Sequence, residues 1–225
     1  MSAQIMTIPM GMANSYLLRN EGAVLIDTGD PGKSGKLFQC LERNEVDPGE
    51  IKLIIITHAH MDHIGSARII RERTGARLAV HSGDRQLLEE GKVRLPPGAT
   101  PWGKFLIGLM SVFAPLVSIE KTEADIVLEE EAFDLSELSI PGKIVHTPGH
   151  TPGSVSVLLD TGEAFVGDSA FNAFPMTLRP GLPVFAHDIP AVKRSLKSLI
   201  EQGAKTIYPS HGKPFPADVL KPLIA

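Results

Sequence analysis

The sequence predicts an α/β fold, an αββα sandwich of two mixed sheets flanked by helices. Strand-like apolar runs occur in clusters in both halves of the chain, and helical segments lie between them. A length of 225 residues with 43% hydrophobic content is enough to bury one sizeable core. We therefore expect a single domain over residues 1–225, with an apolar helical insertion near 96–119.

The first half of the chain mixes strands and helices. The run Leu53-Ile54-Ile55-Ile56 is short, β-branched and bounded by polar residues, which is typical of a buried strand. Expected strands in this half cover residues 3–8, 14–19, 23–27, 52–56, 77–80 and 126–128. Expected helices cover residues 33–44, 62–73, 83–90 and 103–113.

The second half contains strands that run into Pro or Gly and then into a polar residue. Lys143-Ile144-Val145, Ala164-Phe165-Val166 and Thr206-Ile207-Tyr208 all follow this pattern. Expected strands cover residues 132–140, 143–147, 155–159, 163–167 and 206–209. Asp188 with Pro190 indicates the start of a helix at 188–202, and a last helix is expected at 216–223.

Residues 102–117 depart from this regular pattern because they are apolar almost all round. A membrane-spanning helix needs about 20 apolar residues, and Lys104, Gly108 and Pro115 leave the segment too short and broken for stable membrane insertion. Three alternatives remain: a buried helix, a homodimer contact, or a hydrophobic cover over a substrate cleft. A cover would favour an acyl chain or another apolar group.

Potential metal ligands are concentrated just after the strand at 52–56, at His58, His60, Asp62 and His63. Extended backbone lets His58 and His60 share a face, while Asp62 and His63 fall at the turn into the next helix. Imidazole and carboxylate suit Zn or Fe. One short loop therefore offers two separate sets of metal donors.

Three more donors follow expected strand ends, namely His150, Asp168 and His211. Several strand ends could converge on one edge of the fold, where functional loops usually lie. The pattern predicts a composite metal site.

At these residues the sequence resembles the metallo-β-lactamase superfamily, whose hydrolases carry an HxHxDH motif followed by a His, an Asp and a final His. The resemblance extends to Asn14-Ser15-Tyr16-Leu17-Leu18 and Val24-Leu25-Ile26-Asp27-Thr28-Gly29 and spans nearly the whole chain. It implies two divalent metal ions, Zn in the first place, with Fe or Mn as alternatives. One ion would bind His58, His60 and His150, the other Asp62, His63 and His211, with Asp168 bridging the two.

Two neighbouring cations need anionic bridging ligands, so a shared carboxylate and a hydroxide are physically reasonable. Asp168 fits the first role, and Asp62 and Asp168 are the carboxylates expected to serve catalysis. Metal coordination lowers the pKa of water from about 15.7 toward ~7, so the hydroxide could attack an ester, lactone or thioester carbonyl. No Ser or Cys nucleophile is then required.

Other residues are expected around the metals. Asp27 is a candidate to orient a ligand imidazole, and it is equally well explained as a turn residue. Thr57 and Thr151 could donate hydrogen bonds nearby or serve in turns and caps.

A basic group is the candidate contact for an anionic part of a substrate, and it consists of Arg179, His187 and Lys193. Solvated surface positions explain these residues as well. His81, His146 and His187 could each approach the site without binding metal.

The second ligand set contains only His and Asp, which resembles glyoxalase II and related thioester or lactone hydrolases. It lacks the Cys found in many true β-lactamases of the superfamily, so β-lactam hydrolysis is not the first expectation. A mononuclear-iron persulfide dioxygenase, with iron held by two His and one Asp, is the alternative from another reaction class. A metal-binding module without turnover is a third, and a flavodiiron role conflicts with His60, where that group typically has Glu.

Composition limits the classes of molecule that the protein is expected to bind. A net charge of −4 without Lys/Arg runs argues against a nucleic-acid groove and leaves a small-molecule substrate. Cys40 is the only cysteine, so no intramolecular disulfide can form. Because the N-terminus lacks a basic region followed by a long apolar run, we expect a cytoplasmic location.

Overall fold

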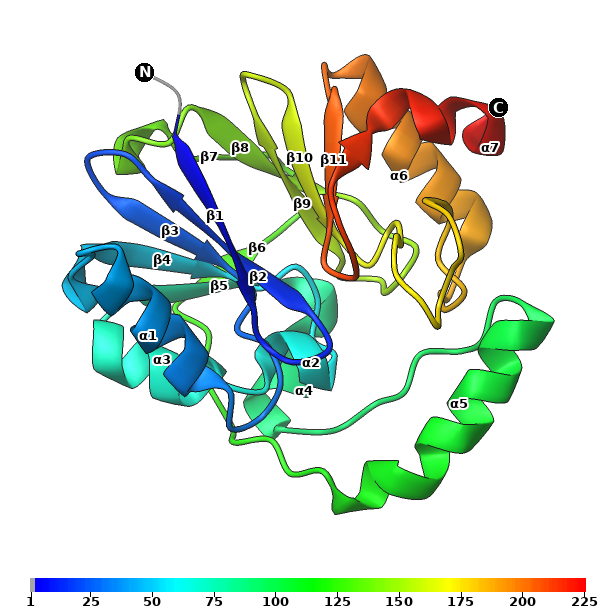
Figure 1. Ribbon diagram of the computed structural model, residues 1–225, viewed down its shortest axis with the longest axis horizontal. Coiled ribbons are helices and arrows are strands. Elements are labelled where there is room, and N and C mark those ends of the chain that lie inside the picture. The colour runs from blue at the N-terminus through cyan, green and yellow to red at the C-terminus, as the bar shows by residue number, and fades with distance from the viewer. Residues whose placement is uncertain (1–2) are drawn as a thin grey trace.

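The computed structural model, which describes residues 3–225, contains two six-stranded sheets packed face to face (Figure 1). The first sheet has the order β1 (Gln4–Pro9), β2 (Asn14–Arg19), β3 (Ala23–Ile26), β4 (Ile51–Ile55), β5 (Arg77–His81) and β6 (Ile126–Leu128). The second has the order β12 (Phe215–Pro216), β11 (Thr206–Pro209), β10 (Glu163–Gly167), β9 (Val155–Leu159), β8 (Gly142–His146) and β7 (Phe133–Asp134). Both sheets are mixed: β3 to β6 and the β10/β11 pair are parallel, and the other pairs are antiparallel.

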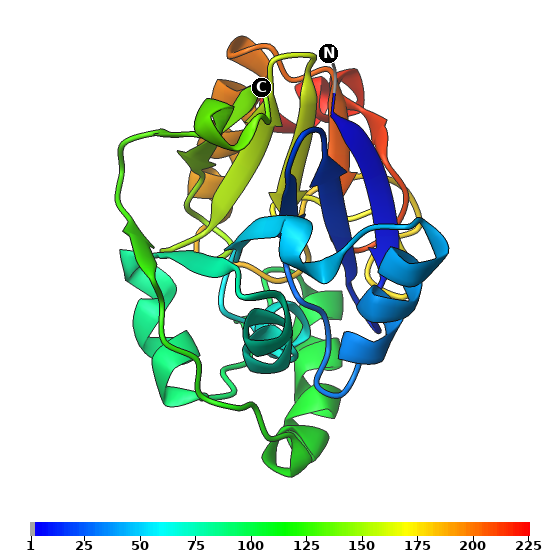
Figure 2. The same cartoon turned by 90° about the vertical axis from the view of Figure 1, so that its left-hand side faces the viewer.

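Helices cover the outer face of each sheet, which confirms the predicted αββα class (Figures 1 and 2). Helices α1 (Ser34–Arg43), α2 (Met61–Ile64), α3 (Ala67–Thr74) and α4 (Ser82–Glu90) accompany the first sheet, and α6 (Ile189–Glu201) and α7 (Lys221–Ile224) the second. Alternation along β4 shows how the layers form: Leu53 and Ile55 pack between the sheets, and Ile54 packs under the helices. From Leu53 onward β4 is buried on both faces and forms one continuous apolar run, as predicted, whereas Lys52 at its start is exposed.

Main-chain hydrogen bonds join the two sheets at one end of the sandwich. Val155 N donates to Thr57 O at 2.8 Å, and Asn14 N donates to Ser210 O at 2.8 Å. The Tyr16 hydroxyl, buried between the sheets, adds a bond to Pro209 O at 2.5 Å. The loops that follow β4 and β11 are thereby held at the same edge.

Three expected elements differ in the structure. The helix expected at 62–73 is divided into α2 and α3 at Ser66, which has φ of −113° and ψ of 12° and whose hydroxyl donates to Asp30 O at 2.7 Å. The strand expected at 132–140 is only β7, because the Asp134 carboxylate accepts Ser136 N and turns the chain into η3 (Ser136–Leu138). The final helix consists of η4 (Ala217–Leu220) and α7, and β12 was not predicted.

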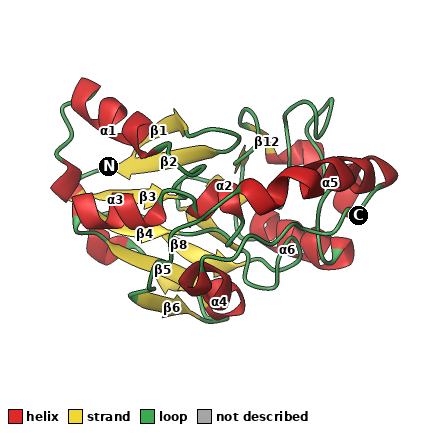
Figure 3. Cartoon of the chain, turned by 90° about the horizontal axis from the view of Figure 1, so that it is seen from below, coloured by secondary structure: helices red, strands yellow, loops and turns green. Residues whose placement is uncertain are grey.

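Helix α5 (Pro101–Phe113) stands beyond the ends of the strands in two perpendicular views (Figures 1 and 2), and Figure 3 shows it from below. Phe105 is 60% exposed and Val112 is 67% exposed, so the alternative of a buried core helix is wrong. Only one side, with Leu106 and Ile107, packs against Phe171 and its neighbours. Among residues 3–225, no helix has the length and hydrophobicity needed to cross a bilayer.

Candidate metal centre

The seven potential ligands lie in loops that follow strands at one edge of the sandwich. His58 and His60 follow β4, and Asp62 and His63 lie in α2, which begins directly after His60. His150 lies between β8 and β9, Asp168 follows β10, and His211 follows β11. The carboxyl ends of β4, β10 and β11 therefore bring distant parts of the sequence to one place.

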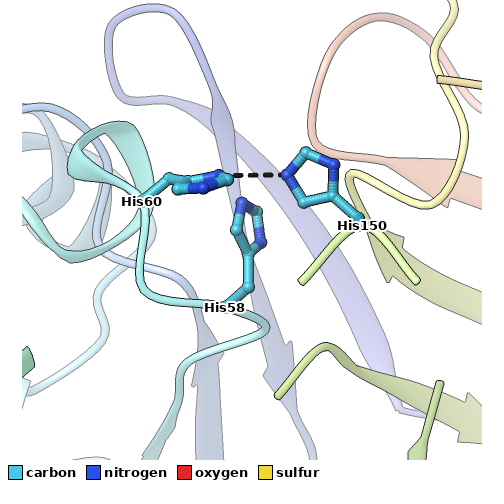
Figure 4. Close-up of side chains that lie close together, drawn as sticks. All are labelled: His58, His60 and His150. Carbon is cyan, nitrogen blue, oxygen red and sulfur yellow. Dashed lines mark hydrogen bonds between the residues drawn. The ribbon is translucent and has the colours of Figure 1, made fainter. Parts of the chain in front are cut away.

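Three groups of side chains have ligand atoms within 4.8 Å of one another. Figure 4 shows the first, in which the rings of His58, His60 and His150 point toward one another, with His150 Nε2 3.0 Å from His60 Nδ1. The other groups are His58, His63 and Asp168, and Asp62, His63 and His211.

Asp168 lies between the donor sets, with one oxygen facing each. Its Oδ2 lies 3.6 Å from His150 Nε2 and 3.9 Å from His58 Nε2. Its Oδ1 lies 3.4 Å from His63 Nε2 and 3.3 Å from His211 Nε2. This is the arrangement of a carboxylate that can serve two sites at once.

Several ligand atoms are buried without a hydrogen-bond partner within the described chain: the Nε2 atoms of His58, His60 and His63, and Oδ1 of Asp168. Buried polar atoms in native proteins almost always have a partner, so a cluster of such atoms with converging lone pairs fits bound cations. The donor set and the fold fit a dinuclear metal site.

The two sets differ in charge. Burial, reinforced by neighbouring imidazoles, lowers the pKa of His60 to about 3 and that of His58 well below its ordinary value. Burial also lowers the pKa of His211, but Asp168 and Asp62 outweigh it and raise this pKa to about 10. In the same way, Asp27 and Asp62 hold the pKa of His63 well above its ordinary value against the effect of burial. Without metal, the first set is neutral and the second carries protons.

The carboxylates show the complementary shift. Burial alone would raise the pKa of Asp62, but His63 and His211 bring it down to about 2. His211 and His63 hold the pKa of Asp168 well below its ordinary value in the same way. Both carboxylates are therefore ionised at neutral pH, as metal ligands must be.

In three of the ligand imidazoles, the nitrogen opposite the ligand atom has its own acceptor. His63 Nδ1 lies 2.8 Å from Asp27 Oδ2, and Asp27 also accepts Thr57 N at 2.8 Å. His150 Nδ1 lies 2.8 Å from Phe185 O, and His211 Nδ1 lies 3.1 Å from Met12 O. An Nδ1 proton donated to these acceptors leaves Nε2 free to bind metal.

Asp27 adopts a left-handed backbone conformation, with φ of 59°, directly after β3. In this position its carboxylate reaches both the Thr57 backbone and the His63 ring. The Thr57 hydroxyl donates to Asp27 Oδ2 at 2.8 Å and lies 3.1 Å from His58 Nδ1. The structure thus places Asp27 and Thr57 beside the ligands, where the sequence pattern suggested them.

Asp84 is a buried carboxylate that sequence reasoning missed. It accepts hydrogen bonds from Ala59 N at 2.9 Å, Thr151 Oγ1 at 2.8 Å and Gly153 N at 3.1 Å. It therefore ties the loop that carries His58 and His60 to the loop that carries His150. In the sequence Asp84 resembles any acidic residue in the first turn of a helix, so no local pattern distinguishes it.

The remaining predicted residues lie farther out. His187 is exposed and lines a small cavity of about 140 Å³ next to His60 and Asp84. Arg179 and Lys193 line neither this cavity nor the larger one beside the ligands. His81 and His146 stack on each other, with ring centroids 3.9 Å apart, outside the three donor groups.

The family model of the metallo-β-lactamase superfamily matches residues 8–211, including all seven ligand positions. The chain belongs to the metallo-β-lactamase superfamily.

Superfamily relatives have similar sequences and folds. A probable metallo-hydrolase of Bacillus subtilis is 30% identical over 167 residues, which cover 71% of this chain and 61% of that protein. A probable metallo-hydrolase of Methanocaldococcus jannaschii is 28% identical over 205 residues, covering 89% of this chain and 88% of that protein. The crystal structure of the BLEG-1 B3 metallo-β-lactamase aligns with a TM-score of 0.70 and 25% identity, covering 96% of this chain and 95% of that one. These likenesses support a hydrolase.

In this metallo-β-lactamase superfamily member, a cavity of about 450 Å³ opens directly onto the ligands. His60, Asp62, Asp168 and His211 form part of its lining. Its other described lining residues are apolar except for Arg94, which also lines the smaller cavity. Arg94 lines both cavities, and Arg179 and Lys193 line neither of them.

Proposed function

We propose that this protein is a metal-dependent hydrolase that cleaves a thioester, a lactone or a related ester, as glyoxalase II-like enzymes do. The observation that carries the proposal is the position of Asp168, whose two oxygens face two different sets of buried imidazoles. In these sets the Nε2 atoms of His58 and His63 have no hydrogen-bond partner within the described chain. His58, His60 and His150 would hold one cation, and Asp62, His63 and His211 the other. When bound, such cations lower the pKa of water toward about 7 and polarise a carbonyl oxygen.

The chain itself contributes position and fixed charge. Asp62, with a pKa of about 2, remains ionised at neutral pH and therefore serves as a ligand rather than as a proton donor. Asp27 and the carbonyl oxygen of Phe185 fix the orientation of two ligand rings. The apolar lining of the 450 Å³ cavity makes the surroundings of a bound substrate less polar than water, which strengthens electrostatic interactions at the reacting carbonyl.

The cavity lining supports hydrolysis by water. No described residue that lines it is a Ser, Thr, Cys, Tyr or Lys, so this cavity offers no side chain of those types for a covalent intermediate. The His and Asp residues that line it, His60, Asp62, Asp168 and His211, would be occupied as metal ligands, which favours water as the nucleophile for a carbonyl compound bound there.

Metal quantification on protein purified without chelator, followed by a substrate panel, tests the proposal. We expect two Zn per chain, with turnover of thioesters or lactones that is lost on chelation. Asp168→Asn should lower kcat/KM by at least about a hundredfold, because one change weakens both sites. One Fe per chain with sulfur-dependent oxygen uptake would instead identify a persulfide dioxygenase and overturn the hydrolase proposal.

A β-lactam is the second candidate substrate, because the BLEG-1 likeness covers 96% of this chain. The amide bond of a β-lactam and the ester bonds above need the same attack at a carbonyl carbon. A β-lactam arm in the same panel separates the two, since hydrolysis of a β-lactam faster than of any ester would replace the first proposal.

A further inference from the structure

The cavity beside the ligands is enclosed on its outer side by α5. Leu106, Leu109 and Met110 of this helix line it, facing Phe174 and Met176 from the loop after β10. Leu95, Pro96, Met12 and Met61 complete the apolar part of the wall. The ligands lie at one end of a hydrophobic chamber.

Specific contacts hold α5 in this position. Thr100 caps the helix by accepting Gly103 N, and Trp102 Nε1 donates to Pro175 O at 2.8 Å. Gly103 lies so close to the loop that a Cβ atom would be 2.0 Å from Val184 O. The first turns of α5 are therefore attached to the same loop that forms the opposite wall of the chamber.

The apolar lining of the cavity determines which kind of ligand can bind there. A polar chain such as a peptide or a glycan would leave its donors and acceptors unpaired against Leu, Met, Phe and Pro side chains. A volume of about 450 Å³ lies within the usual range for small-molecule pockets, and flexible Met side chains adapt to a chain of varying shape. An unbranched hydrocarbon chain fits both observations.

The smaller cavity next to the ligands is polar by comparison. It is lined by Asp84, Glu90 and Lys92 and, on its outer side, by His187. His60 and Arg94 line both cavities, so the two are neighbours at His60. If the scissile bond of a substrate lies beside His60, the apolar cavity is on one side of that bond and the polar cavity is on the other.

We propose that the substrate is an acyl thioester or ester whose hydrocarbon chain lies beneath α5 and whose polar leaving group lies toward Arg94 and His187. This rests on the proposed hydrolase function. Water adds to the carbonyl carbon, the C–S or C–O bond breaks, and the products are the fatty acid and a thiol or alcohol that takes up a proton from that water. The substrate class is thus set by the two cavities and not by the ligands.

A series of acyl thioesters from acetyl to dodecanoyl tests the chain-binding part with the metal-loaded enzyme. Each added methylene group should raise kcat/KM about fourfold until the chamber is full, after which kcat/KM should level off. Leu109→Trp should move that plateau to shorter chains, because it fills the chamber from a position that is 55% exposed and tolerates a large side chain. Val112→Trp, on the same helix but outside the chamber lining, is the matched control and should leave the profile unchanged.

A binding measurement without turnover separates this inference from the hydrolase proposal. Fatty acids of the same lengths should displace a fluorescent fatty-acid probe from the metal-stripped protein, with the same dependence on length and the same change in Leu109→Trp. Displacement that depends on chain length, without hydrolysis of any ester, would support hydrocarbon-chain binding beneath α5 and contradict the hydrolase function. Hydrolysis that is flat in chain length, without displacement, would reject the chamber and retain the hydrolase.

Discussion

Replacing Asp84 by Asn should weaken the metal set of His58, His60 and His150 while leaving the other set intact. The Asp84 carboxylate accepts Ala59 N and Thr151 Oγ1 on one oxygen and Gly153 N on the other. An Asn side chain can replace only one of these two acceptor oxygens, because its NH2 group is a hydrogen-bond donor. With its oxygen toward Ala59, its NH2 would face the Gly153 N–H group.

The size of the effect follows from the bonds that change. One hydrogen bond to a charged acceptor is lost, at about 1.5–3 kcal/mol, and the buried Gly153 N–H is left without a partner. The two remaining bonds also lose their charge assistance. We expect a total of about 3 kcal/mol, which for a chain of this size lowers Tm by about 6–12 °C. Metal affinity at the affected set should fall about 10–100-fold, as it does when partners behind ligands are removed.

Two measurements separate stability from metal binding. Tm is compared in excess chelator, and affinity is measured by competition with a chromogenic zinc chelator, in which two binding steps should be resolved. Asp125→Asn is the matched control. Asp125 accepts hydrogen bonds from Arg71 and Leu78, and it belongs to none of the three donor groups and lines neither cavity, so its replacement should affect Tm alone. If Asp84→Asn retains both binding steps at full affinity, or loses both equally, Asp84 does not position the first set.

Three further predictions concern the protons released on zinc binding, the attachment of α5 and the pH dependence of stability. Zinc binding to metal-free protein at neutral pH should release protons from His63 and His211, whose pKa values are raised, and none from His58, His60 and His150, whose pKa values are lowered. Calorimetry in buffers of different ionisation enthalpy counts the released protons. A zinc affinity that does not change with pH near neutrality would contradict this assignment of protons. Gly103→Ala should detach the first turns of α5, because the new methyl group would collide with Val184 O. The fluorescence emission of Trp102, the only tryptophan, should then shift to the red. An unchanged spectrum would show that the loop at Val184 adjusts to the methyl group while α5 stays in place. The Arg71 guanidinium lowers the pKa of Asp125, so this pair stabilises the fold above the ordinary Asp value near 4, and that contribution disappears as the pH falls through the lowered pKa. The free energy of unfolding of Asp125→Asn should therefore differ from that of wild type by less than about 1 kcal/mol at pH 7, and the difference should shrink as the pH falls through the lowered pKa of Asp125.

Local patterns predicted the parts of the structure that depend on neighbouring residues in sequence. The apolar run before Thr57 and the donors after it are adjacent in the chain, so strand and ligands could be read together. His150, Asp168 and His211 were recognisable because each follows a strand end in the same way. The fold class followed from the same periodicity.

What the sequence could not reveal depends on distant contacts. Asp84 acquires its role from Ala59 and Gly153, which lie 25 and 69 positions away. The exposure of α5 has a similar origin: hydrophobicity predicts that a segment seeks apolar contact, but the side it turns toward the ligands depends on the loop at Phe171–Phe185. Arg94 was absent from the predicted substrate contacts for the same reason, since it reaches the cavity through the path of the chain before α5.

The hydrogen bonds that join the two sheets have a consequence for how the protein matures. The strands up to β6 contribute His58, His60, Asp62 and His63, and the strands from β7 onward contribute His150, Asp168 and His211, so neither half of the chain carries a full set of ligands. A cation can bind tightly only after the halves have docked, and its binding then favours the docked state by mass action. Two separately expressed halves should therefore reassemble more completely in the presence of zinc than in excess chelator.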